Sequence, residues 1–361
     1  MKKINFCLLS VLSILVLSCS TGEDKNGGVS IMTLKLEAGD STCTERMFMS
    51  ILDTIIIKDR DATPLRSIAK VVQIGDTLYI LDDRADALYL YDKAGCFVSK
   101  IGEKGKGRKE YLRIEDFTVD KQSKKVIILS NNSKIVVYDN DGSFITSKTL
   151  CKSLIYKIHS TSWGYIATSL HRTYTEGDDA YLLYCFDKNF KQISKNIRVL
   201  PVQISAPNFV SSVFQQVNDK LYFFDPFQGL IYDVTQSENI HVVSQIDIPN
   251  RVPIETLSSA MNFMQNQHKY NWMMDCILFA DCTFTSYIYD DNYSMAVFDA
   301  NGKPMCMGAL SQGTIPTSFH SNNGAMVSPI TIEDESQDEL FGIIEWQINN
   351  RQQQPKSAIS R

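Results

Sequence analysis

The chain has 361 residues, 44% of them hydrophobic and 21% charged, and its 36 Lys and Arg against 41 Asp and Glu give a formal charge of −5. This length is enough for one large all-β domain or two ordinary domains. Because basic residues do not outnumber acidic ones, the composition argues against a nucleic-acid partner.

The N-terminus has the layout of an export signal. A basic start precedes an apolar run at residues 6–17, which ends in Leu17-Ser18-Cys19. The run is shorter than the roughly 20 residues that a membrane-spanning helix needs. The Leu-Ser-Cys arrangement resembles the lipobox of bacterial lipoproteins, and this resemblance implies lipidation of Cys19 after removal of signal peptide 1–18. An ordinary secretory signal that contains a cysteine is the alternative.

Residues 19–30 are polar and rich in glycine and charge, so we expect them to form a flexible tether. Ser20 after the lipid-bearing cysteine resembles lipoproteins sorted to the outer membrane, and Glu23-Asp24 resembles an acidic surface-export signal of Bacteroidota. The resemblance implies a lipid-anchored outer-membrane protein, on the cell surface or the periplasmic side. The membrane would then be a partner through the acyl chains.

An internal repeat organises the rest of the chain. Apolar runs end in an aspartate and a short turn, as in Leu88-Tyr89-Leu90-Tyr91-Asp92 and Ile135-Val136-Val137-Tyr138-Asp139. The marker aspartates are Asp92, Asp139, Asp187, Asp233 and Asp299, at intervals of 47, 48, 46 and 66 residues. The alternation has a period of two, which predicts strands, and the Asp and Gly residues at the joints are typical of hairpin turns. The fourth interval therefore holds one unit plus an insertion.

One unit divides into four predicted strands, at residues 67–73, 77–81, 87–92 and 96–101. Four antiparallel strands in about 47 residues are the blade of a β-propeller. The early strand 49–57 is expected to pair with segment 325–347 and complete a sixth blade. We therefore predict an all-β fold, a six-bladed propeller over residues 31–350, followed by a polar tail at 351–361.

The insertion carries a helical signal near residues 254–268. Ile254, Leu257, Met261 and Met264 recur at helical spacing, with polar residues between them. This pattern predicts a short amphipathic helix whose apolar side packs on the propeller.

Two stretches, residues 100–120 and 135–145, resemble the six-bladed propeller lipoproteins of Bacteroidota, which are related to NHL-repeat propellers. Those proteins read Ile-Gly-x-x-Gly-x-Gly-Pro-x-Glu-Tyr between blades, and here Arg108 replaces the proline. The resemblance implies a propeller fold and an envelope location. It implies no activity, because propellers host many functions.

The sequence offers no catalytic residue, metal ligand set or cofactor motif. Asp139-Asn140-Asp141-Gly142 resembles the start of a calcium loop but lacks the distal glutamate, so a hairpin turn is the better interpretation. No lysine-hydroxyl pair follows the glycines at 102, 105 and 107, and no Gly-x-Ser-x-Gly occurs. Without a CxxC pair, the cysteines after Cys19 are best interpreted as buried structural thiols.

A binding surface is expected on the propeller face that gathers the connections from the second to the third strand and from one blade to the next. These loops carry aromatic, charged and amide groups that suit a glycan, a peptide or an outer-membrane protein partner. The candidate ligand-binding residues are Arg84, Arg108, Tyr111, His171, Arg172, Tyr174, Phe227 and Tyr293. Lys188 and Asn189, in a turn on the opposite face, are expected to matter neither for binding nor for stability. The sequence thus favours a non-catalytic binding module, and the alternative is a glycan hydrolase or lyase acting from the same loop face.

Overall fold

The computed structural model describes residues 31–39, 45–58, 65–131, 133–172, 180–200, 203–207, 210, 212–309, 320–322, 325–333 and 339–349. They belong to one compact unit, Ile31–Arg361. The predicted signal peptide and tether, Tyr174 and the predicted tail lie outside the described residues.

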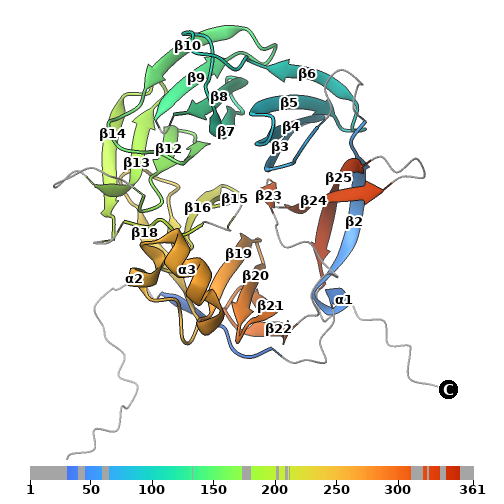
Figure 1. Cartoon of the computed structure of the whole chain (residues 1–361), viewed down its shortest axis with the longest axis vertical. Helices are drawn as coiled ribbons and strands as arrows, with labels where there is room; N and C mark the ends of the chain where they lie inside the picture. The colour runs from blue at the N-terminus through green and yellow to red at the C-terminus, as the bar shows by residue number, and fades with distance from the viewer. Residues whose placement is uncertain are drawn as a thin grey trace, which may run out of the picture. The chain divides into compact units, whose positions relative to one another are not determined.

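Six antiparallel sheets succeed one another around a centre, which confirms the predicted six-bladed propeller (Figure 1). Blade I is β3 (Lys70–Ile74), β4 (Thr77–Asp82), β5 (Ala87–Asp92) and β6 (Phe97–Ile101), and blade II is β7 (Ile114–Asp120), β8 (Lys125–Ser130), β9 (Lys134–Tyr138) and β10 (Phe144–Thr149). Blade III is β11 (Lys157–Ser160), β12 (Gly164–Thr168), β13 (Tyr181–Asp187) and β14 (Gln192–Arg198). Blade IV is β15 (Phe214–Val217), β16 (Lys220–Asp225), β17 (Leu230–Asp233) and β18 (His241–Asp247), and blade V is β19 (Trp272–Leu278), β20 (Cys282–Tyr289), β21 (Asn292–Asp299) and β22 (Pro304–Ala309).

Blade VI joins the two ends of the described chain. It contains β23 (His320–Asn322), β24 (Ala325–Glu333), β25 (Glu339–Ile348) and the early strand β2 (Met49–Ile56), which follows helix α1 (Glu45–Phe48). β2 pairs antiparallel with β25, with Ile55 opposite Ile343. The outermost strand of this blade therefore comes from the N-terminal side of the chain, which closes the ring.

The marker aspartates organise the turns between the third and fourth strands. In blade III, Asp187 Oδ1 accepts hydrogen bonds from the backbone N–H of Asn189 at 2.8 Å and of Lys191 at 2.9 Å. Asp92 and Asp299 hold their own turns by the same two bonds, to the residues two and four positions on. The turn that resembles a calcium loop is a hairpin turn, in which Gly142 has φ +87° and its N–H donates to Asp139 O at 3.0 Å. The aspartate thus recurs in the sequence because these turns use its side chain to accept hydrogen bonds from their backbone.

The core lies between adjacent blades, because each sheet buries both of its faces. Val126 and Ile128 of β8 pack against blade I, whereas the alternate residues Ile127 and Leu129 pack against blade III. This explains why the middle strands are almost continuously apolar. Four of the six described cysteines are buried, and none of the six is in a disulfide.

A strand that the sequence analysis did not predict extends blade IV. β1 (Met32–Lys35) pairs in parallel with β18, with Met32 opposite Ser244. Leu34 is fully buried, and the Tyr287 hydroxyl of blade V donates to Glu37 O at 3.1 Å. The segment that follows the predicted tether therefore joins the outer edges of blades IV and V.

The insertion is helical, as predicted, but its buried side differs from the prediction. It forms α2 (Ile254–Leu257), α3 (Ala260–Asn266) and the 3-10 turn η1 (Gln267–Lys269). Met261 and Met264 are 71% and 54% exposed, whereas Phe263 is buried against the Trp272 ring. The helical period does not run through the insertion, because Ser259 begins a new helix as the N-cap of α3. Among the described residues, no helix has the length and apolarity to cross a membrane.

Candidate ligand-binding cavity at the inner strands

The innermost strands of four consecutive blades, β3, β7, β11 and β15, enclose a cavity of about 220 Å³. Its polar lining comes from the strands themselves and from the turns that follow them. The lining residues with chemical functionality are Lys70, Asp116, Thr118, Asp120, Lys121, Gln122, Lys157, His159, Ser160, Thr161, Ser162, Ser212 and Gln216. The cavity therefore has a mixed lining, in which these polar groups lie beside the apolar side chains of Val72, Ile74, Val119, Ile158, Val213 and Phe214.

Lys70 and Asp116 form an ion pair across the boundary of blades I and II. Lys70 Nζ lies 2.7 Å from Asp116 Oδ1 and also donates to Phe117 O at 2.7 Å. The second oxygen, Asp116 Oδ2, accepts from the backbone N–H of Ile158 at 2.8 Å. Burial lowers the pKa of Lys70, and the charge of nearby Lys157 adds to the lowering, whereas Asp116 opposes it. One carboxylate thus links the inner strands of three blades.

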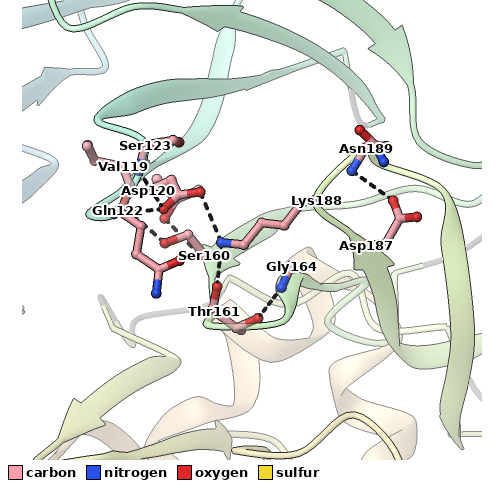
Figure 2. A network of polar contacts seen from close by, with 11 residues as sticks. Val119, Asp120, Gln122, Ser123, Ser160, Thr161, Gly164, Asp187, Lys188 and Asn189 are labelled. Atoms are coloured by element: carbon pink, nitrogen blue, oxygen red, sulfur yellow. Dashed lines mark hydrogen bonds and ion pairs between the residues drawn. The ribbon is translucent and has the colours of Figure 1, made fainter.

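Asp120 is held in a similar way at the end of β7. Figure 2 shows its carboxylate facing Lys188, whose Nζ lies 3.0 Å from Asp120 Oδ2 and 2.8 Å from Thr161 O. Asp120 Oδ1 accepts from the backbone of Gln122 at 3.0 Å. Burial opposes ionisation of Asp120, but the hydrogen bonds from Lys188 and from the backbone outweigh it and lower the pKa of this carboxyl. Both carboxylates of the cavity are therefore committed to contacts within the protein.

His159 lies half-buried on β11, with its ring 5.9 Å from that of Phe214. Burial, with the positive charges of Lys70 and Lys121, lowers the pKa of His159 to about 3, although Asp116 opposes this. The imidazole is therefore neutral at physiological pH. No three His, Cys, Asp or Glu side chains among the described residues are placed to hold a metal ion.

None of the described ligand-binding candidates from the sequence lines this cavity. Arg84 and Arg108 are exposed on the loop face, where their predicted role stays a prediction. Tyr111 and Tyr293 are buried and pack within hydrophobic clusters. Phe227 lines a small apolar pocket of about 40 Å³ beneath the helical insertion. As placed, Tyr111 and Tyr293 support the blades and present little surface to a ligand.

His171 and Arg172 also make internal contacts. His171 Nδ1 accepts from the backbone N–H of Leu200 at 3.1 Å, so Nε2 carries the proton that faces Asp225 Oδ2 at 2.9 Å. Arg172 Nη2 donates to Ala206 O at 2.6 Å, and its guanidinium lies over the Tyr156 ring. The prediction that these side chains bind a ligand rests on their loop position alone, and loop position gives no information on how they pack.

The glycine-rich joint between blades I and II has a structural explanation. The carboxylate of Glu110 fills the loop, where its Oε2 accepts from Gly107 N at 2.7 Å. A Cβ at Gly105 would lie 2.0 Å from the same oxygen, so a larger residue there would require the Glu110 side chain to move. The glycine-rich loop is thus occupied by a glutamate of the chain itself.

The sequence analysis predicts the inner strand of blade I, at residues 67–73, but it does not predict a cavity at the inner strands. The sequence signal that could have indicated the cavity is the alternation of polar residues on β11, where Lys157 and His159 lie two positions apart. Lys70 occupies the position of blade I that is equivalent to Lys157. Polar residues that alternate on an innermost strand point to a solvated interior.

Comparison with known proteins assigns the chain to a protein family. The model of a family described as a domain of unknown function (DUF4934) matches residues 60–359. The chain belongs to this family. The DUF4934 match begins after β2, so it covers the repeat but not the strand that closes blade VI. Among curated proteins there is no match.

Two solved structures share the architecture of this DUF4934 protein. One, from Bacteroides fragilis, is described as a "putative exported protein" and superposes with a TM-score of 0.71 at 15% identity, over 89% of this chain and 100% of that one. The other is a DUF4221 family member from Bacteroides vulgatus, with a TM-score of 0.57 at 9% identity, over 84% of this chain and 98% of that one. At these identities the likeness concerns the fold.

Proposed function

We propose that this protein is an exported, lipid-anchored binding module of the bacterial envelope, which takes a small ligand into the cavity of the inner strands. The cavity itself carries the proposal, since a concave site built from four blades, lined by apolar side chains and convergent polar groups, can bury and orient a ligand. The export signal and the similar fold of the Bacteroides fragilis protein support the envelope location.

The arrangement of the carboxylates favours binding without turnover. A glycoside hydrolase needs two available carboxyl groups, one of them protonated. In the cavity, Asp116 is paired with Lys70 and Asp120 with Lys188, and both accept backbone hydrogen bonds as well. Neither carboxyl is placed to donate a proton to a leaving group.

The proposal can be tested by thermal shift against mono- and disaccharides, sugar acids, sugar phosphates, amino acids and dipeptides. Ser162 is an exposed lining residue in the turn after β11, so Ser162→Trp should obstruct the cavity. Asn189→Trp adds the same ring to an exposed turn that does not line the cavity. We expect stabilisation of the wild type and of Asn189→Trp that is lost in Ser162→Trp.

Stabilisation that persists in Ser162→Trp would place the ligand elsewhere, and no stabilisation by any compound would contradict a small-ligand site. Release of a reaction product from an oligosaccharide would favour the hydrolase or lyase alternative.

A further inference from the structure

The lining of the cavity has an excess of positive charge. Three lysines (Lys70, Lys121 and Lys157) face two carboxylates, and one of these, Asp120, is already neutralised by Lys188 from outside the cavity. Lys157 has no carboxylate within ion-pair distance in the part of the chain that the structure describes. The cavity therefore holds like charges close together, which a bound anion would relieve.

Several lining groups have a donor left for a ligand. Thr118 Oγ1 accepts from Ser160 N, and Thr161 Oγ1 accepts from Gly164 N, so each hydroxyl has its own proton left to donate. The Lys157 ammonium adds three donors. The strongest acceptors, the carboxylates, are already occupied by the contacts described above. Such a lining matches a ligand that is rich in acceptor oxygens.

The volume limits the size of this ligand. About 220 Å³ is below the roughly 300–1,000 Å³ of pockets for drug-sized molecules, yet several times the roughly 30 Å³ that one water occupies in the liquid. A single inorganic oxyanion would leave most of the cavity to water, whereas a sugar acid or sugar phosphate carries many acceptor oxygens in a small volume.

We infer that the cavity binds an anionic monosaccharide, a sugar acid or a sugar phosphate, and that Lys157 holds its charged group. Thr118 and Thr161, on either side of the boundary between blades II and III, donate to the remaining ligand oxygens. The inference rests on the proposed function, because it names the ligand class of the same site.

Isothermal titration calorimetry with D-glucuronate, D-glucose 6-phosphate, D-glucose and inorganic phosphate tests this inference. We expect glucuronate or glucose 6-phosphate to bind at least about tenfold more tightly than glucose, and more weakly as salt screens the charges. Lys157→Met should weaken that binding at least about tenfold, and Lys157→Arg should largely retain it. Lys152→Met, at an exposed lysine just before β11 and outside the cavity, is the matched control and should bind like the wild type.

Each outcome separates the two proposals. Glucose binding as tightly as the sugar anions, with loss in Ser162→Trp, would overturn the anionic ligand and leave the cavity as a binding site. Undiminished binding of the anions by a folded Lys157→Met would overturn the role of Lys157. Equal affinity for inorganic phosphate and glucose 6-phosphate would overturn the sugar. Absence of binding by all four probes would contradict the ligand class, while the thermal-shift panel decides separately whether the cavity binds a small ligand.

Discussion

Lys188 Nζ lies 3.0 Å from Asp120 Oδ2, so a turn of blade III is bonded to the end of strand β7 of blade II beside the cavity (Figure 2). The ammonium also lies over the Tyr165 ring, at 5.6 Å from its centroid. We predict from the place of Lys188 in a turn that it matters little for stability, whereas these contacts favour a stabilising role. The turn pattern predicts the backbone conformation around Lys188, but it gives no information on the carboxylate of Asp120, which lies 68 residues earlier in the chain.

Replacing Lys188 should destabilise the propeller. Lys188→Met removes an ion pair to a buried carboxylate and a hydrogen bond to Thr161 O, so we expect the free energy of unfolding to fall by about 1 to 2 kcal/mol. The exposed neighbour Asn189→Ala provides the control and should change it by less than about 0.5 kcal/mol. Urea unfolding measures both, and equal stability of the two variants would show that the blades are not joined here.

The contact between β1 and blade V can be probed with two glycines. Gly302 has φ +77°, and a Cβ there would lie 2.9 Å from Met32 Cγ. Gly75 has φ +59° with nothing within 4 Å of such a Cβ. Both alanine variants carry backbone strain, but Gly302→Ala also crowds the Met32 side chain of β1, so it should be less stable than Gly75→Ala by up to about 1 kcal/mol. A Gly302→Ala variant as stable as Gly75→Ala would contradict the packing of Met32 against this turn.

His159 should make stability depend on pH. Its pKa is lowered to about 3 in the folded protein and is about 6.5 in an unfolded chain, so below pH 6.5 the unfolded state binds more protons. Stability is therefore complete above about pH 6.5 and falls on acidification towards pH 3. Between pH 7 and 5 we expect a loss of about 1 to 2 kcal/mol from this group.

The His159→Gln variant should flatten the loss of stability between pH 7 and 5, as measured by denaturant unfolding at each pH. His268→Gln, at an exposed position on η1, should keep the slope of the wild type. An unchanged slope in His159→Gln would show that His159 is solvated in the folded protein.

The anchor prediction is independent of the fold. Cys19→Ala should remove labelling of the protein by a fatty-acid analogue in a bacterial host, because no other residue of the signal fits a lipobox. Persistent labelling would contradict the lipobox interpretation and with it the proposed membrane attachment.

The repeat could be predicted because its cause is local. Asp92, Asp187 and Asp299 bond to backbone N–H groups two and four residues on, so the requirement appears at a constant spacing in the sequence. β1 could not be predicted in this way, since its four residues pair with β18 more than 200 positions later. The cavity could not be predicted from the sequence for the same reason. The pairing of Lys70 with Asp116, and the absence of a carboxylate beside Lys157 among the described residues, depend on which blades become neighbours.

A crystal structure of the protein with D-glucuronate or D-glucose 6-phosphate would test the central claim most directly. We expect the sugar inside the cavity of β3, β7, β11 and β15, with its carboxylate or phosphate about 3 Å from Lys157 Nζ. A sugar bound on the loop face beside Arg84 or Arg108, with the cavity occupied only by water, would contradict it.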